Sequence, residues 1–263
     1  MQSTSPQGCA HQPARFTDTH WRTRCELAAL YRLVAHFRMT DLIYTHISAR
    51  LPGTQDRFLI NRYGVLFDRM CASDFVEVDY DGNAVGSDES EAAARVNRAG
   101  FVIHSAIHAA RPDLHFVVHT HTAAGIAVAA QKQGLLPISQ FAMKFYNRLA
   151  YHDYEGVALE LGERERLVQD LGPHRAMVLR NHGLLVGGRT APEAFSLIYS
   201  LERACQVQIQ ALAGGAELLN VPPHEVCERA AQQTSPEEIP PHYDLAWSAV
   251  LGLIEDGKPD YRT

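Results

Sequence analysis

Two short apolar runs that end near histidine are the feature that most constrains how this chain can fold. The first reads LHFVVHTH, from Leu114 to His121, and the second reads MVLRNHG and reaches His182. Short apolar runs bounded by polar residues are typical of strands buried in a sheet. Residues i and i+2 of a strand share one face. We therefore expect the side chains of His119 and His121 to lie side by side at a strand end.

This pair of histidines predicts a metal site. Two neighbouring imidazoles can bind one divalent cation, at about 2.0–2.1 Å each for zinc. If the two apolar strands are neighbours, His182 can supply a third ligand, because Gly183 lets the backbone turn sharply after it. Three histidines with an open position are typical of catalytic zinc, whereas structural zinc usually takes four ligands with cysteine among them. The alternative is that these are ordinary core or surface histidines.

The other histidines of this histidine-rich chain are less informative. The chain has 14 in total. His104 and His108 lie four residues apart in a predicted helix, so they are a possible ligand pair, but we favour a role in lining the packed face of that helix. His46, His152 and His174 stand alone and are interpreted as ordinary residues.

The hydrophobic pattern predicts both helices and strands along most of the chain. Hairpins are expected in the first third, around a turn at residues 52–56 and around Asp81-Gly82. The segment LPISQFAMKFYNRLAYHDYEG is interpreted as two strands with a loop, and residues 86–100 as mainly a loop. The predicted helices span about residues 17–39, 101–111, 122–133, 163–171 and 192–212. Hairpins followed by alternating strands and helices predict a mixed, largely antiparallel sheet covered by helices.

Composition excludes several classes of protein. The formal net charge is −6 and no run of Lys or Arg could follow a phosphate backbone, so a nucleic-acid partner is not expected. No apolar run approaches the ~20 residues that span a bilayer, and residues 1–16 lack a signal-peptide core and are interpreted as a mobile leader. The five cysteines are scattered and odd in number, which indicates reduced thiols in a cytoplasmic protein.

Several of these segments resemble the class II aldolase/adducin family. GFVIHSAIHAARPDLHFVVHTHTAAG and MVLRNHGLL resemble the two blocks that carry its metal histidines, and the likeness runs from about Arg22 to Leu212. NRAGFVIHSAIHAARPD, YHDYEG and LRNHG also resemble adducin head domains, which favours the adducin-like bacterial branch. The resemblance implies a three-layer α/β/α fold with a central, mainly antiparallel sheet in a single domain, residues 17–263, with a tail from about residue 214. It also implies a homotetramer.

The same resemblance maps the three zinc ligands of the family onto His119, His121 and His182. Zinc is then the expected ion, although imidazole ligands also accept Mn²⁺, Fe²⁺ or Co²⁺. The family's acid/base glutamate, in contrast, falls on Gly100, and the two residues before it are Arg98-Ala99 rather than phosphate-binding serines. A glycine cannot carry a proton.

The phosphate-binding segments also depart from the family pattern. The loop NRYG keeps Gly64, but Arg62 and Tyr63 differ, and His46 stands where a phosphate-contacting asparagine is usual. We therefore do not expect a sugar phosphate as substrate. Gly64 and Arg98 remain the candidate substrate-binding residues, and Arg62 or Arg98 could hold a carboxylate, because a guanidinium pairs with it bidentately.

Three functions are compatible with this pattern. The first is a metal-dependent lyase, an aldolase or decarboxylase acting on a small carbonyl or hydroxy acid compound, with Asp153 and Tyr154 as candidate catalytic residues and His152 or Glu155 as alternatives. Aldol cleavage needs a general base, whereas decarboxylation needs only an electron sink. The second is a binding or scaffold protein like adducin, disfavoured because the chain stops at Thr263 without a Lys-rich tail. The third is a metal-dependent epimerase.

Overall fold

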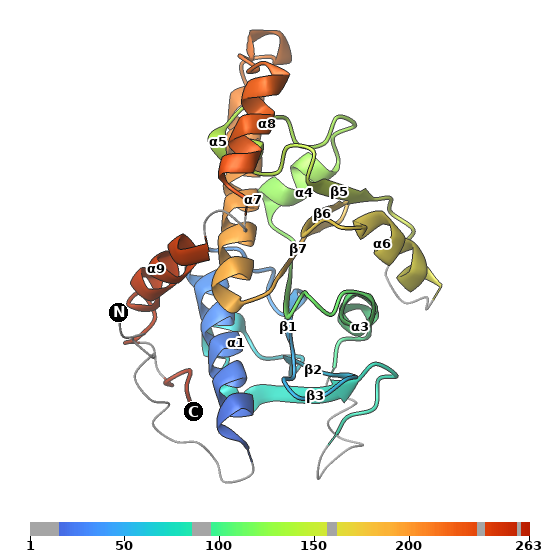
Figure 1. Cartoon of the computed structure of the whole chain (residues 1–263), viewed down its shortest axis with the longest axis vertical. Coiled ribbons are helices and arrows are strands. Elements are labelled where there is room, and N and C mark those ends of the chain that lie inside the picture. Colours follow the sequence, from blue (N-terminus) through green and yellow to red (C-terminus); the bar gives the residue numbers. More distant parts are fainter. Residues whose placement is uncertain (1–15, 86–95, 157–161, 236–239, 257–258) are drawn as a thin grey trace.

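The fold is built around one mixed sheet (Figure 1). In this computed structural model the described residues are 16–85, 96–156, 162–235, 240–256 and 259–263. Residues 1–15 of the predicted leader and residues 86–95 of the predicted loop lie outside them. Among the described residues seven strands pair in the order β3-β2-β1-β4-β7-β6-β5, and every neighbouring pair is antiparallel except β5 with β6.

The strands are short and buried. They are β1 His46–Arg50, β2 Arg57–Asn61, β3 Phe75–Asp79, β4 Phe116–Thr120, β5 Leu149–His152, β6 Ala176–Leu179 and β7 Gly183–Gly188. Neighbouring residues of one strand belong to different cores, as Val117 and Val118 of β4 do, because successive side chains point to opposite faces. The sheet is therefore covered on both sides.

Helices form the two outer layers. They are α1 Asp18–His36, α3 Arg98–Ala110, α4 Ala123–Ala129, α5 Gln140–Met143, α6 Glu163–Leu171, α7 Ala191–Leu212, α8 His224–Gln233 and α9 Pro240–Leu251. Side chains of α1, α7 and α9 pack on one face of the sheet, and those of α3 and α6 pack on the other. Figure 1 shows α1 and α7 on the opposite side of the strands from α3 and α6. The predicted three-layer α/β/α architecture with a mainly antiparallel sheet is confirmed.

Several element boundaries follow from capping side chains. Thr17 and Thr190 precede α1 and α7, and their hydroxyls accept hydrogen bonds from the backbone N–H groups of His20 and Glu193. Such caps satisfy donors that have no partner inside the helix. The first predicted hairpin forms as β1 and β2. Around Asp81-Gly82 the predicted second strand is reduced to a single bridge between Val78 and Ala84.

One predicted strand is wrong. The segment after Pro137 forms α5 and a turn instead of a strand. The Ser139 side chain accepts a hydrogen bond from the backbone N–H of Ala142, which starts a helical turn, and the buried residues Ala142 and Phe145 are three apart, as on one helix face. The predicted strand that follows is present as β5. The tail from about residue 214 contains α8 and α9, and Trp247 of α9 packs into the same core as α1 and α7.

None of the described helices is long and apolar enough to cross a membrane.

Candidate metal centre

Three histidine side chains meet at one end of the sheet. The Nε2 atoms of His119 and His121 are 2.7 Å apart, and those of His121 and His182 are 3.0 Å apart. The His182 ring centroid lies 4.7 Å from that of His119 and 4.8 Å from that of His121. The ring of residue 182 is thus well within reach of the other two, as the sequence predicts.

The sheet topology explains this convergence. His119 and Thr120 end β4, which pairs with β7, whose first residue is Gly183. β7 lies between β4 and β6, so the strand before His182 is not itself a neighbour of β4. His182 lies in the tight turn between β6 and β7, directly before the strand that pairs with β4. A side chain at Gly183 would clash with the backbone carbonyl oxygen of Thr120. Glycine is therefore required here for close backbone approach.

Two hydrogen bonds fix which nitrogen of each ring faces the centre. The Nδ1 atom of His119 lies 2.9 Å from the Leu184 carbonyl oxygen, which can only accept, so Nδ1–H donates. The Nδ1 atom of His121 lies 3.2 Å from the Asp41 carboxylate and donates in the same way when the ring is neutral. Both Nε2 lone pairs then point at each other, an arrangement that a cation stabilises.

The donor set fits a divalent metal ion. One nitrogen from each histidine lies within 4.8 Å of the others, and no other such group of His, Cys, Asp or Glu occurs in the described part of the chain. Tetrahedral coordination with bonds of about 2.0–2.1 Å would place these nitrogens about 3.3 Å apart. Small ring movements would reach that spacing. Asp41, which orients His121, is a typical partner of a metal-binding histidine.

Burial and neighbouring histidines keep two of these rings, His119 and His182, neutral. Burial, followed by the positive charges that His182, His46 and His121 would carry, holds the pKa of His119 well below its usual value. Burial and then His121 and His152 lower the pKa of His182 to about 4. Neutral imidazole is the form that binds a metal. His119 and His182 are therefore ready to act as ligands at neutral pH.

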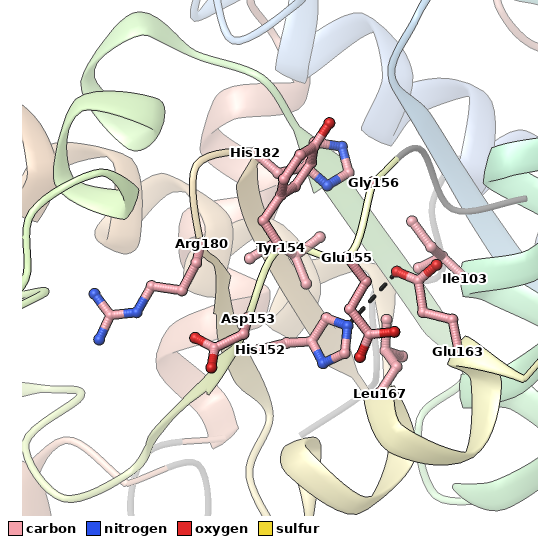
Figure 2. Close-up of a pocket in the computed structure, with 11 residues that line it drawn as sticks. Ile103, His152, Asp153, Tyr154, Glu155, Gly156, Glu163, Leu167, Arg180 and His182 are labelled. Atoms are coloured by element: carbon pink, nitrogen blue, oxygen red, sulfur yellow. Dashed lines mark ion pairs between the residues drawn. The ribbon is translucent and has the colours of Figure 1, made fainter. Parts of the chain in front are cut away.

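A small cavity adjoins His182 and contains the predicted catalytic residues (Figure 2). Its volume is about 10 Å³, which is room for about one water molecule. The Tyr154 ring lies 6.4 Å from the His182 ring, centroid to centroid, and is 54% exposed. In Figure 2 Tyr154 points toward His182, whereas the Asp153 carboxylate points away from it. Beside them, the buried His152 contacts Asp170 at 2.7 Å and Glu163 at 3.6 Å.

This three-histidine geometry agrees with a family match over most of the chain. The model of the class II aldolase and adducin N-terminal domain matches residues 25–209.

The chain belongs to the class II aldolase and adducin family.

Full-length bacterial relatives and solved structures support this membership. The "Putative aldolase class 2 protein" of Caulobacter vibrioides is 44% identical over 247 residues, 94% of each chain. An aldolase II superfamily protein from Pseudomonas syringae is 50% identical and superposes with a TM-score of 0.88, covering 95% of this chain and 98% of its own. L-fuculose 1-phosphate aldolase from Glaciozyma antarctica is 26% identical, with a TM-score of 0.81 over 96% of this chain and 97% of its own.

The adducins are also relatives. Rat alpha-adducin is 45% identical over 199 residues, which are 74% of this chain but 27% of the adducin. The match to class II aldolases therefore covers nearly the whole chain, while the match to adducin covers a small part of a much longer protein.

Gly100 and His46, two positions at which the sequence is expected to depart from the aldolase pattern, lie against each other. A Cβ atom at Gly100 would be 2.6 Å from Cδ2 and 2.8 Å from Cγ of His46. The imidazole ring thus fills the space that a side chain at position 100 would need. His46 pairs with His119 across the sheet, and their ring centroids are 4.9 Å apart. His46 therefore lies between Gly100 and His119, one of the candidate metal ligands.

His46 begins a buried chain of polar groups that sequence reasoning missed. Its Nδ1 lies 2.7 Å from Nε2 of His104, and Ser48 Oγ bonds both Nδ1 of His104 and, at 2.8 Å, Nε2 of His108. Burial holds the pKa of His46 and His104 well below the usual value and lowers that of His108 to about 3. The predicted packed positions of His104 and His108 are present, but their hydrogen bonds to another strand had no signal in the sequence.

The remaining candidates have different surroundings. Arg62 forms an ion pair with Asp74 at 2.8 Å, so a carboxylate of the chain already balances its charge. Arg98 is exposed at the start of α3, two residues before Gly100. Gly64 has a φ of 96°, in the region that favours glycine, and the space around it is open. Asp41 is the partner of His121 that sequence reasoning missed, because it lies in a loop with no periodic pattern.

Proposed function

We propose that this protein is a divalent-metal-dependent lyase that breaks a carbon–carbon bond in a small carbonyl or hydroxy acid compound. The observation that carries the proposal is the convergence of three Nε2 atoms. That of His121 lies 2.7 Å from that of His119 and 3.0 Å from that of His182. Three histidines leave a coordination position for substrate, as in catalytic sites. Similarity to aldolases along nearly the whole chain supports the same class of reaction.

The three histidines would hold the ion, with Asp41 and the Leu184 carbonyl oxygen fixing two of the rings. Zinc suits this donor set best in our proposal, because histidine nitrogens are among its usual ligands and three of them leave one position open. When bound, such an ion would polarise a substrate oxygen and stabilise the negative charge that develops as the carbon–carbon bond breaks. Metal analysis after purification without chelator identifies the ion.

Tyr154 is our first candidate for the group that moves a proton, and Asp153 is the second. The Tyr154 side chain is exposed and its ring lies 6.4 Å from that of His182, so it could contact a substrate held there. Asp153 lines the same small cavity, but its carboxylate would have to turn toward the metal centre to take part. Removing a general acid or base typically costs 10²–10⁴-fold in rate. If cleavage is a decarboxylation, no hydroxyl proton has to be removed, and Tyr154→Phe should cost far less.

The substrate is expected to carry a carboxylate rather than a sugar phosphate. Arg98 is exposed at the start of α3 and would pair with the carboxylate, and the open space at Gly64 would accept part of the substrate. These assignments rest on the replacement of the family's phosphate-contacting residues. A screen of carbonyl and hydroxy acids for release of CO₂ or an aldehyde separates decarboxylase from aldolase.

The metal centre is tested with His121→Ala, and His115→Ala is the matched control because His115 is exposed outside the cluster. Both variants are refilled with Zn²⁺ or Mn²⁺ and analysed by mass spectrometry. We expect occupancy of the His121 variant to fall below about one-fifth of a metal per chain, because two ligands rarely retain an ion through purification, while the control binds like the unaltered protein. Equal occupancy in the two variants would show that the ligands are wrong.

A scaffold function is the second candidate, favoured by the 45% identity with rat alpha-adducin. An unaltered protein that binds no metal after refilling would support it. We also propose a homotetramer, for which the exposed Leu42 and Tyr44 beside Asp41 provide apolar surface near the metal centre. Light scattering in solution measures this directly. A cytoplasmic location remains a prediction, supported by the four free cysteines of the described chain.

A further inference from the structure

A second, larger cavity lies away from the metal centre. It opens where α7, the end of α8 and the segments before β5 and β6 meet, and its volume is about 250 Å³. Ala176 begins β6, whereas His182 follows the other end of that strand, so the two sites lie toward opposite ends of it. The polar side chains among the described residues that line the cavity, here called the basic pocket, are Lys144, Arg148, His174, Arg175, Thr234 and Ser235.

The basic pocket presents positive charge on one side and apolar surface on the other. No described residue that lines it is acidic, and its apolar walls include Phe145 and Leu197. The carboxylates that pair with its arginines are not among the lining residues: Glu228 lies 3.2 Å from Arg148, and Glu193 pairs with Arg175. Two of the positive charges are thus balanced from outside the cavity, and Lys144 is left to be considered.

Lys144 is the group that most needs a further partner. Its Nζ donates to the hydroxyl oxygens of Ser196 and Ser200, both at 3.3 Å, and lies 5.2 Å from the centre of the Tyr243 ring. Within the described chain no carboxylate forms an ion pair with it. Glu193 acts on it only from a distance, because that carboxylate is bound by Arg175 and Arg189.

Burial of this ammonium group lowers its pKa to about 8, against a small opposing effect of Glu193. Lys144 is therefore still mainly protonated at pH 7. Lys144 is partly buried, and a charge partly removed from water without a counter-charge is destabilising, which an anion entering the cavity would relieve. The hydroxyls of Ser196 and Ser200 are neutral and cannot supply that counter-charge.

We infer that the basic pocket binds a small organic anion, a phosphate monoester or a dicarboxylate, through Lys144 and Arg148. The ammonium group supplies a point charge, the guanidinium can donate two parallel hydrogen bonds, and the hydroxyl of Ser235 can add a further donor. The Thr234 hydroxyl donates to the Ala230 carbonyl oxygen instead. The apolar walls would contact the carbon portion of the ligand. A cavity with few polar groups on an apolar surface is the usual form of such sites.

Calorimetric titration of the full chain at pH 7 tests this inference, with inorganic phosphate and succinate as separate probes. We expect at least one probe to bind and Lys144→Met to weaken its binding at least tenfold. The matched control is Lys132→Met, because Lys132 is exposed outside the pocket, and it should bind like the unaltered protein. Binding of phosphate alone identifies a phosphate ligand, and binding of succinate alone a dicarboxylate. Absence of binding by both probes overturns the inference.

Two additional variants keep the result unambiguous. If Lys144→Met does not fold, Arg148→Met should weaken binding about tenfold, and unchanged binding in the folded variant would overturn the inference. In contrast, His121→Ala should bind the anion like the unaltered protein. Loss of anion binding in that variant would show that the probe binds at the metal centre instead. The experiments can therefore reject anion binding in the basic pocket without rejecting the proposed lyase activity, and the reverse.

Discussion

The imidazole ring of His46 fills the space in which a side chain at position 100 would lie. Alanine normally stabilises a helix interior by about 1 kcal/mol relative to glycine. At position 100, in the first turn of α3, the added methyl group would meet ring atoms of His46 at 2.6–2.8 Å. That ring is held by His104 and packs against His119, so it cannot move freely.

We therefore predict that Gly100→Ala lowers the free energy of unfolding by about 1–3 kcal/mol, the usual cost of overpacking. Urea denaturation measures the change. In a His46→Ala background the same substitution should cost much less or stabilise the protein, because the ring is gone. An equal cost in both backgrounds would show that the clash with His46 is not its origin.

Asp41 orients His121 of the proposed metal centre without being one of the proposed ligands. Its carboxylate accepts from Nδ1 at 3.2 Å and so directs Nε2 toward the other rings. Loss of such a partner typically weakens metal binding 10–100-fold. We predict this loss for Asp41→Asn, measured by competition with a chelating dye, and no change for Asp56→Asn, an exposed residue of the β1–β2 turn. Equal affinities in the two variants would remove Asp41 from the site.

At the scale of elements, Tyr31 ties α1 to the sheet. Its buried hydroxyl donates to the carbonyl oxygen of Ile47 at 2.6 Å and accepts from the Ile47 N–H at 2.7 Å. The same strand, β1, is an inner strand of the sheet and begins with His46, beside His119, so one contact links the helix, the sheet and the surroundings of the site.

Tyr31→Phe should lower the free energy of unfolding by about 1–3 kcal/mol, because buried backbone groups of β1 lose their partner. Thermal and urea denaturation measure this change. Tyr44→Phe is the control, since Tyr44 is 49% exposed and its hydroxyl can bond water. If the two variants are equally stable, the hydroxyl of Tyr31 does not hold the helix to the sheet.

At the scale of the whole molecule, buried neutral histidines make stability depend on pH. The pKa of His108 is lowered from 6.5 to about 3 by burial and then by Arg50, and those of His46 and His104 are also lowered. Above pH 6.5 neither folded nor unfolded chains protonate these rings. Below it the unfolded chain takes up the protons first, so stability falls as the pH falls.

We predict that the metal-free protein loses about 1.4 kcal/mol per pH unit for each such histidine between about pH 6 and pH 4. Urea denaturation with chelator at several pH values gives the slope. His108→Gln should reduce the slope by about one proton. A slope that does not change in the folded variant would mean that His108 is protonated in the native state.

The sequence by itself determined the architecture and the three metal-binding candidates. Apolar runs and their polar ends reflect which residues are buried, and the i, i+2 spacing of a strand puts His119 and His121 on one face wherever that strand lies. Both depend on neighbours within a few residues. The failure at α5 was also local, because a serine cap started a helical turn in a segment that resembled a strand.

Only the tertiary structure decided what surrounds those histidines. Asp41 reaches His121 across 80 residues, and His46 reaches His104 across 58. The occupied space at Gly100 and the surroundings of Lys144 in the basic pocket likewise depend on how β1, α3, α7 and α8 pack. Side chains that strand order and helix packing bring together leave no periodic pattern in the chain. Tertiary packing alone therefore determines their contacts and the pKa shifts that burial causes.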